Sequence, residues 1–453
     1  MRHILRAALF VLVISGFMVQ SCGKEPVEKK RVMGVAHPEW SRNKTIYELN
    51  VRQFSPSGTF KAVEQRLVAL KDLGVGIIWL MPIHPIGQKN RKGALGSPYS
   101  VQDYFAVNPE YGTLQDFKAL VEKVHRLGMY VILDWVANHT AWDNPLLKQH
   151  PEWFKRDSAG NFVSPAPDWT DVVDLDYSQR GLWQYMIKAM KYWVEVMDVD
   201  GFRCDVAEMV PLAFWENARA ELDKIKPVFM LAEGEKPELH RAFDMTYSWK
   251  MHYLWNAIAD GDRSAKEIDD LLREEKKMYP ADAYRMRFIS NHDENAWKGT
   301  AFERLDGGVR AFSVLMTTIP GKPLLYNGQE VGLDKRLKFF DKDPIEWKIN
   351  NYRRFYRRLF TLYQAEPALY EGSMTKIPTE MDSRVYAFAR EKGNRRVVVI
   401  LNLSPVRVKV DIDSDYLDGS MVEYFTGIKV NYHGHHTFDL EPWAYRLYLP
   451  KND

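Results

Sequence analysis

The stretch "GFRCDVAEM" (201–209) places an arginine and an aspartate two positions apart at the end of an apolar run that is typical of a buried strand. Because side chains alternate along a strand, Arg203 and Asp205 should point to one side and Cys204 to the other. Such a pair either stabilises the fold as a buried ion pair or takes part in chemistry. If the pair faces a site, we expect Cys204 to pack beneath a helix and to be unreactive.

Seven further runs of the same kind accompany this one along the chain. The eight predicted strands are 45–51, 76–83, 129–136, 199–206, 228–234, 242–249, 284–291 and 322–328. Apolar residues at helical spacing predict helices between them, at 60–73, 113–128, 178–197, 265–277 and 308–318. Thr113 and Asp116 form the signature of a capping box at the start of one such helix. Strands that alternate with helices predict an α/β fold, a (β/α)8 TIM barrel over 43–365.

Two segments depart from a minimal barrel. The stretch 139–176, between the third strand and its helix, is long and rich in Pro, Trp and Asp, which predicts a small inserted subdomain beside the mouth of the barrel. After residue 365 the helical period stops and alternating apolar residues take its place. We therefore expect a C-terminal antiparallel β-domain, a β-sandwich, over 366–453.

The N-terminal residues predict export. Residues 1–22 have the basic start and short apolar core of a signal peptide, and "VQSC" resembles a bacterial lipobox whose cysteine, Cys22, becomes lipidated. Residues 23–42 then form a tether from the membrane, on its periplasmic or cell-surface face. The alternative is an ordinary signal peptide that is cleaved nearby. Since Cys204 is the one other cysteine, the mature protein has no internal disulfide.

The charge balance excludes one class of partner. The chain has 62 basic and 60 acidic residues, a net charge of +2. A nucleic-acid-binding protein normally shows a strongly basic face, so we expect no nucleic acid partner.

Acidic residues stand at the ends of several predicted strands, where a barrel of this type forms its site. An acid beside a guanidinium favours its ionised form, so Asp205 suits a nucleophile. Glu233 follows an apolar run without a cation beside it in sequence, so it should hold its proton as a general acid must. Two such carboxyl groups on neighbouring strands are what cleavage of a glycosidic bond requires. Glu235 is the rival for the acid, and Glu208 is expected on a solvated face.

Four motifs then carry a family resemblance. "DWVANH" (134–139), "GFRCD" (201–205), "LAEGE" (231–235) and "FISNHD" (288–293) resemble, in order and spacing, the four signatures of the α-amylase superfamily, glycoside hydrolase family 13. "PYSVQDY" (98–104) resembles the family's tyrosine-containing loop after the second strand. The resemblance extends from about residue 40 to 450.

The resemblance implies roles for individual residues. Asp205 matches the nucleophile, Glu233 the acid/base, and Asp293 the carboxylate that supports the transition state. The matching substrate-binding residues are Tyr99, His139, Arg203 and His292. The implied reaction is hydrolysis of α-1,4-glucosidic bonds in starch or maltooligosaccharides with retention of configuration, through a covalent glycosyl ester on Asp205.

The resemblance leaves the metal open. Asn138 matches a calcium ligand, and the acids Asp168, Asp171 and Asp174 of the inserted segment offer further oxygen donors. Calcium at this position and no cofactor at all are both compatible with the sequence. Glu208 and Met209 stand where many α-amylases have a Lys and a His that contact the leaving-group sugar, so the chain departs from the family's pattern there.

Two other functions stay open at this point. One is a neopullulanase-like, cyclomaltodextrinase-like or transglycosylating member of the same family, because a change of acceptor needs only small changes in the site. The other is a non-catalytic glucan-binding lipoprotein. The presence of all three acids, Asp205, Glu233 and Asp293, favours an enzyme.

Overall fold

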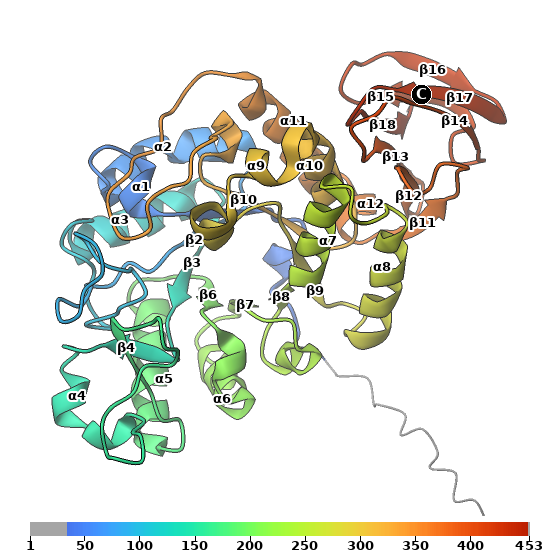
Figure 1. The fold of residues 1–453 in the computed structure, drawn as a ribbon. Coiled ribbons are helices and arrows are strands. Elements are labelled where there is room, and N and C mark those ends of the chain that lie inside the picture. The colour runs from blue at the N-terminus through green and yellow to red at the C-terminus, as the bar shows by residue number, and fades with distance from the viewer. Residues whose placement is uncertain (1–33, 452–453) are drawn as a thin grey trace, which may run out of the picture. The chain divides into compact units, whose positions relative to one another are not determined.

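The computed structural model describes residues 34–451, and its centre is a closed barrel of eight parallel strands (Figure 1). The barrel strands are β1 (Ile46–Leu49), β2 (Ile77–Leu80), β3 (Tyr130–Trp135), β6 (Gly201–Cys204), β7 (Phe229–Ala232), β8 (Met245–Tyr247), β9 (Tyr284–Arg287) and β10 (Lys322–Tyr326). They follow the order β1-β10-β9-β8-β7-β6-β3-β2 around the barrel. The eight predicted strands and the (β/α)8 fold class are confirmed.

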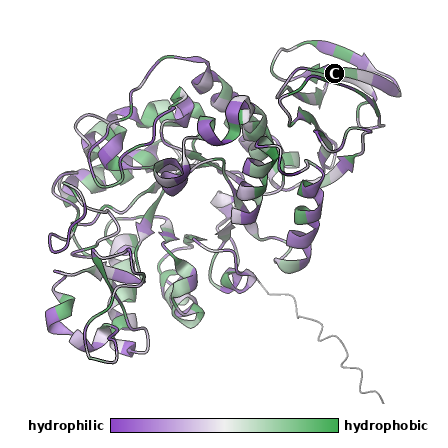
Figure 2. Ribbon diagram, viewed as in Figure 1, coloured by the Kyte–Doolittle hydropathy of each residue, from purple (hydrophilic) through white to green (hydrophobic). Residues whose placement is uncertain are grey.

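Helices surround the barrel. The longer ones are α2 (Phe60–Leu73), α3 (Leu114–Arg126), α5 (Arg180–Glu195), α6 (Leu212–Leu222), α7 (Trp249–Ala259), α8 (Glu267–Met278), α10 (Val309–Thr318) and α11 (Asn351–Ala365). The short ones are α1 (Val51–Phe54), α4 (Leu146–Gln149), α9 (Ala301–Leu305) and α12 (Pro367–Tyr370). The capping box of α3 is present, since Thr113 accepts a hydrogen bond from the Asp116 N–H and donates its own N–H to the Asp116 carboxylate. Figure 2 shows hydrophobic and hydrophilic residues side by side on most of these helices, as amphipathic helices on a barrel require.

The apolar core has two layers. One cluster fills the barrel interior with strand side chains such as Trp79, Leu231 and Met286. The larger cluster lies between the strands and the helices, and Cys204 belongs to it. Arg203 is fully buried and contacts groups of the barrel mouth, whereas the neighbouring Cys204 packs among apolar side chains of the outer layer. The alternation expected for β6 is therefore present, and burial raises the pKa of the Cys204 thiol.

The segment between β3 and α5 forms a small structure of its own. It contains the antiparallel pair β4 (His139–Ala141) and β5 (Val172–Asp174) together with α4. His139 opposes Asp174 in this pair, so the histidine at the barrel mouth is held by the far end of the insertion.

The C-terminal part is made of antiparallel strands. They are β11 (Ser373–Ile377), β12 (Val385–Lys392), β13 (Arg395–Asn402), β14 (Val408–Asp413), β15 (Gly419–Glu423), β16 (Lys429–Tyr432), β17 (His435–Leu440) and β18 (Tyr445–Pro450). The pair β14-β17 stands apart from a six-stranded sheet of order β11-β12-β13-β18-β15-β16. Side chains from both sheets share one apolar cluster, so the predicted C-terminal antiparallel β-domain is confirmed.

The predicted signal peptide and its lipobox Cys22 lie outside the described residues. The last part of the predicted tether differs from the expectation of a free linker. The Val35 N–H donates to the carbonyl of His240 (3.1 Å), His37 Nδ1 lies 2.8 Å from Asp244 Oδ1, and Trp40 stacks on Tyr130. Hydrophobic and hydrogen-bonded contacts therefore hold residues 35–42 against the barrel. Within residues 34–451, none of the helices has the length and apolar character that a membrane span needs.

One glycine fixes the closure of the barrel between β6 and β7. Gly201 has φ +148°, and a Cβ added there would lie 1.9 Å from the carbonyl oxygen of Phe229, its partner on β7. A side chain at this position would push the two strands apart beneath Arg203.

We expect Gly201→Ala to lower the free energy of unfolding by at least about 3 kcal/mol, because a backbone clash adds to the strain of positive φ. Gly261→Ala is the matched control, since φ is +82° there and the described residues place no heavy atom within 4 Å of the added Cβ. It should cost about 1–2 kcal/mol. Urea denaturation measures both, and equal losses would contradict the role given to Gly201.

Candidate active site

A single buried guanidinium lies at the mouth of the barrel and contacts three carboxyl groups. Arg203 Nη1 donates to Asp134 Oδ1 and to Asp205 Oδ1, both at 2.9 Å. Its Nη2 forms an ion pair with Glu233 Oε2 at 2.9 Å. The Arg203 side chain is 0% exposed, so these contacts take the place of water around its charge.

The barrel register explains why these groups meet. Asp134 on β3 lies directly beside Arg203 on β6, so their side chains point in the same direction. Asp205 follows β6 by one residue and Glu233 follows β7 by one residue. The carboxyl ends of neighbouring parallel strands thus place the predicted nucleophile and the predicted acid on one cation.

A second group of side chains lies next to this cluster. Tyr99 donates its hydroxyl hydrogen to Asp134 Oδ2 (3.0 Å), and its oxygen lies 2.8 Å from His292 Nε2. His292 Nδ1 donates to Glu48 Oε1 of β1 at 2.5 Å. Asp293 Oδ2 lies 3.3 Å from His292 Nε2, and the Asp293 side chain is 37% exposed. His139 Nε2 completes the group at 4.0 Å from Asp205 Oδ2.

The residue after Asp205 has a strained backbone. Val206 has φ +37°, a conformation that β-branched residues rarely adopt. Its N–H donates to Glu233 Oε2 at 2.7 Å. The strain therefore serves to aim a backbone donor at the predicted acid/base.

Burial dominates the ionisation of the two facing acids. Burial raises the pKa of Asp205 to about 6, although Arg203 opposes the rise. Burial likewise raises the pKa of Glu233 to about 7, again against Arg203. Arg203 favours the ionised form of Asp205, as its place beside the acid predicts, but desolvation outweighs the guanidinium. Glu233 has no cation beside it in sequence, but Arg203 of the neighbouring strand β6 supplies one.

The two histidines ionise in opposite directions. Burial would lower the pKa of His292, but Asp293 and Glu48 raise it to about 9. Burial lowers the pKa of His139 to about 4, which keeps its imidazole neutral. The site therefore combines a charged donor at His292 with a neutral imidazole at His139.

The side chains of this site that are not fully buried line one cavity of about 730 Å³. Tyr99, His139, Asp205, Glu233, His292 and Asp293 contribute to its wall. Further lining residues that the sequence did not predict include Lys92, Trp169, Trp297, Phe339 and Phe340. Loops after β2, β3, β9 and β10 supply them, and the length of those loops was the one signal that could have pointed to them.

Comparisons with known proteins agree with this fold and site. The family model for the alpha amylase catalytic domain matches residues 40–170 and 167–358, and the model for the maltogenic amylase C-terminal domain matches 374–447. The chain belongs to the α-amylase family. It is a glycoside hydrolase, and the resemblance carried by its four motifs is confirmed.

Solved structures of α-amylases share the whole architecture. A noncanonic maltogenic alpha-amylase, AmyB, from Thermotoga neapolitana is 35% identical, with a TM-score of 0.84 over 91% of this chain and 100% of that one. An alpha-amylase from Lactobacillus plantarum is 34% identical, with a TM-score of 0.81 over 90% and 99% of the two chains. Alpha-amylase 2 of Dictyoglomus thermophilum is 25% identical over 84% of this chain and 73% of its own length.

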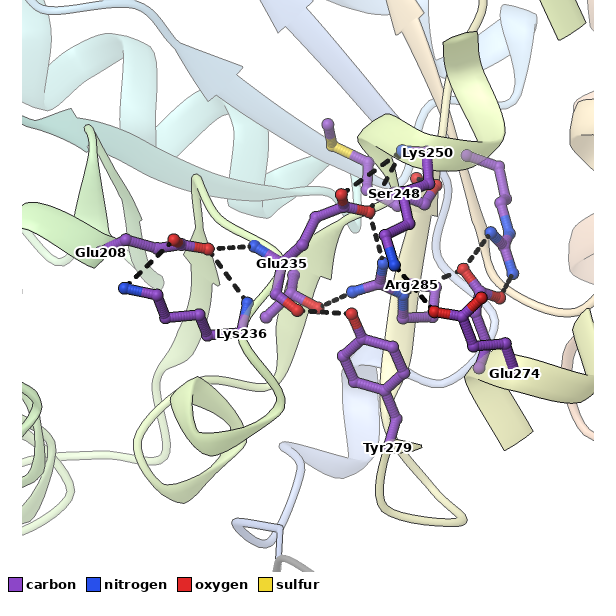
Figure 3. A network of polar contacts seen from close by, with 12 residues as sticks. Glu208, Glu235, Lys236, Ser248, Lys250, Glu274, Tyr279 and Arg285 are labelled. Atoms are coloured by element: carbon purple, nitrogen blue, oxygen red, sulfur yellow. Dashed lines mark hydrogen bonds and ion pairs between the residues drawn. The ribbon is translucent and has the colours of Figure 1, made fainter. Parts of the chain in front are cut away.

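The rival acid of this α-amylase-family enzyme is engaged elsewhere (Figure 3). Glu235 Oε1 pairs with Arg285 Nη2 at 3.0 Å, and Glu235 is not among the residues that line the cavity. Glu208, which the sequence placed on a solvated face, instead accepts hydrogen bonds from the backbone N–H groups of Glu235 (2.5 Å) and Lys236 (3.0 Å). Glu208 therefore fixes the loop after β7, because a short helical turn after β6 carries it toward that loop.

The donors around Asn138 do not fit a resident calcium ion. Lys155 Nζ lies 2.8 Å from Asp174 Oδ2, and Lys92 Nζ lies 3.2 Å from Asp171 Oδ1. One oxygen of Asp174 lacks a hydrogen-bond partner, but calcium takes six to eight oxygens and is repelled by an adjacent ammonium. Residues 34–451 contain no group of three or more acidic, histidine or cysteine side chains arranged to hold a metal.

The charge on His292 gives a direct test of the electrostatics. We expect Glu48→Gln to lower the pKa of His292 by about one pH unit or more, since an opposite charge at contact distance raises a histidine pKa by about 1–3. Nuclear magnetic resonance of histidine-labelled protein measures it. His139 in the same sample is the internal control, and an unchanged His292 titration would contradict the assignment of the charge to the Glu48 contact.

Proposed function

We propose that this enzyme cleaves α-1,4-glucosidic bonds of starch or maltooligosaccharides by retaining hydrolysis, with Asp205 as nucleophile and Glu233 as general acid/base. The observation that carries the proposal is the shared guanidinium, since Asp205 and Glu233 contact neighbouring nitrogens of Arg203. Carboxyl groups held this near to each other suit the retaining geometry, in which they lie about 5 Å apart with no room for a water between nucleophile and sugar.

The first half of the reaction uses both acids at once. An oxygen of the Asp205 carboxylate attacks C1 of the sugar, and the bond between C1 and the glycosidic oxygen breaks. Glu233 gives its proton to that oxygen, so the leaving sugar departs as an alcohol. A glycosyl ester on Asp205 remains, with inverted configuration at C1.

The second half returns the enzyme to its starting state. Glu233, now a carboxylate, removes a proton from water while the water oxygen attacks C1. The ester bond breaks, Asp205 regains its negative charge, and two inversions give net retention. The Val206 N–H and Arg203 both contact Glu233 Oε2, so they stabilise the carboxylate between its two proton transfers.

The remaining side chains hold the sugar ring. The Tyr99 ring lines the cavity beside Asp205 and offers a flat face for a pyranose. Charged His292 and neutral His139 also line the cavity, and we expect both to hydrogen-bond hydroxyl groups of that ring. The negative charge of Asp293 stabilises the positive charge that develops at C1 in the transition state. The two solved relatives described above, at 35% and 34% identity, are α-amylases, which supports an α-1,4-glucan as substrate.

Substitutions of the acids test this proposal. With an aryl α-maltoside as substrate, Glu233→Gln should lower kcat by about 10²–10⁴, the range that general acid–base catalysis contributes. Asp205→Asn should cost at least as much, and Glu235→Gln should keep kcat near that of wild type. Azide should restore turnover of Glu233→Ala and yield an α-glycosyl azide, which a merely structural role would not produce. A β-azide, or a loss in Glu235→Gln alone, would contradict the assignment.

The two raised pKa values predict the pH profile. Asp205 must be ionised and Glu233 protonated, so kcat/KM should fall below about pH 6 and again above about pH 7 as the pair titrates. Initial rates across pH 4–9 on a soluble maltooligosaccharide measure both limbs. A plateau that extends unchanged to pH 9 would contradict Glu233 as the acid.

The lysine contacts of the inserted segment lead to a proposal of calcium independence. Lys155 and Lys92 already neutralise Asp174 and Asp171, so dialysis against a calcium chelator should leave both kcat and the midpoint of thermal unfolding unchanged. A loss of activity or of thermal stability after dialysis, if added calcium reverses it, would contradict calcium independence.

The proposed location is a bacterial membrane surface, reached through a lipid on Cys22. The support is the basic and apolar leader followed by "VQSC". In cells that export and lipidate such proteins, the wild type should partition into detergent on Triton X-114 phase separation and Cys22→Ala into water. A wild type found in the aqueous phase would contradict the anchor.

A further inference from the structure

The loop after β2 lies firmly against the loop after β10. The Ala94 N–H donates to Asp341 Oδ1 at 2.9 Å, and the Leu95 N–H donates to the carbonyl of Phe340 at 3.0 Å. Gly93 has φ +62°, and a Cβ added there would lie 2.5 Å from the Cβ of Phe340. The two loops approach so closely that a glycine is required between them.

Lys92 extends this contact to the inserted segment. Its ammonium donates to the carbonyl oxygen of Asp168 and lies 3.2 Å from Asp171 Oδ1. The same nitrogen lies 5.8 Å from the ring centroid of Phe340. Lys92, Asp168 and Phe340 all line the cavity. The side chain is 30% exposed and that of Asp171 is 7% exposed, so the charged contact is partly shielded from water.

The barrel order shows which side of the cavity this bridge closes. Around the barrel in one direction, β10, β9 and β8 separate β1 from β7. In the other direction, β2, β3 and β6 separate them. Strand β7, which Glu233 directly follows, therefore lies opposite β1. The loops joined at Gly93 follow β2 and β10, the two strands that flank β1. The leaving sugar lies over Glu233, because that residue protonates the glycosidic oxygen. The bridged side is then the one that receives the glycone.

We infer that Lys92 closes the glycone end of the cavity, so that this enzyme removes short units from the non-reducing ends of α-glucans instead of cutting within the chain. The inference rests on the proposed function, because it takes Glu233 as the acid that marks the leaving-group side. The closed space suits a glycone of about two glucose units, a ligand of the size that cavities of 300–1,000 Å³ enclose. Phe340 and Trp169 beside Lys92 supply aromatic surface for its sugar faces.

A substrate with a blocked end tests the bridge. The two substrates are p-nitrophenyl α-maltoheptaoside and its analogue with an ethylidene group on the non-reducing glucose. We expect the wild type to cleave the free substrate mainly to maltose and the shortened glycoside, and to cleave the blocked one poorly. Chromatography of early products gives both rates and the size of the unit released.

Two variants of the bridge sharpen the test. Lys92→Ala removes the bridge, and Lys92→Met keeps the length of the side chain without its charge. Each should raise the ratio of the rate on blocked substrate to the rate on free substrate by about tenfold, the factor that about 1.4 kcal/mol corresponds to. Lys89→Ala is the control, since Lys89 lies in the same loop over Trp142 and does not line the cavity. Its ratio should equal that of wild type.

The possible outcomes distinguish a failure of this inference from a failure of the proposed function. Equal wild-type rates on the two substrates would overturn the closed end and leave the retaining hydrolase intact. An unchanged ratio in Lys92→Ala and Lys92→Met, with thermal unfolding like that of wild type, would overturn the role of Lys92. Inactivity of the wild type on both substrates would overturn the proposed function and this inference with it.

Discussion

The burial of one guanidinium is the constraint on which the site depends. Arg203 is fully buried at the end of β6 and contacts Asp134, Asp205 and Glu233 from three adjacent strands. A buried cation that loses one partner leaves an uncompensated charge, at a cost of about 3–5 kcal/mol. The three carboxyl groups and the arginine therefore fix one another, and the register of β3, β6 and β7 is fixed with them. The arginine itself need not react to determine where the chemistry occurs.

The same burial sets the protonation states. Desolvation raises the pKa of both facing acids above its ordinary value, and Arg203 limits the rise. Glu233 ends higher than Asp205, so near pH 6–7 one carboxyl holds its proton while the other has lost it. The strained N–H of Val206 and the charged His292, held by Glu48, complete an electrostatic arrangement that exists before substrate arrives.

The sequence predicted the barrel and its acids because both depend on local patterns. Apolar runs alternate with helical periodicity, and the acids stand directly after strands, so Asp205, Glu233 and Asp293 could be placed at one end of a barrel. Contacts between distant loops were beyond such reasoning. Lys92 meets Phe340 and Asp168 across long separations, Glu208 reaches the backbone of the loop after β7, and Glu48 of β1 reaches His292. Nor could residues 35–42 be seen to pack on the barrel, because their contacts with Tyr130, His240 and Asp244 come from far along the chain.

Identification of the nucleophile tests the account most directly, since it asks which carboxyl on Arg203 forms the bond to sugar. Incubation of the wild type with 5-fluoro-α-D-glucosyl fluoride, followed by proteolysis and mass spectrometry, locates a trapped sugar ester in the sequence. The account predicts the fluoroglucosyl label on Asp205, in the peptide that contains "GFRCDVAEM". A label on Asp134, Glu233 or any other residue would contradict it.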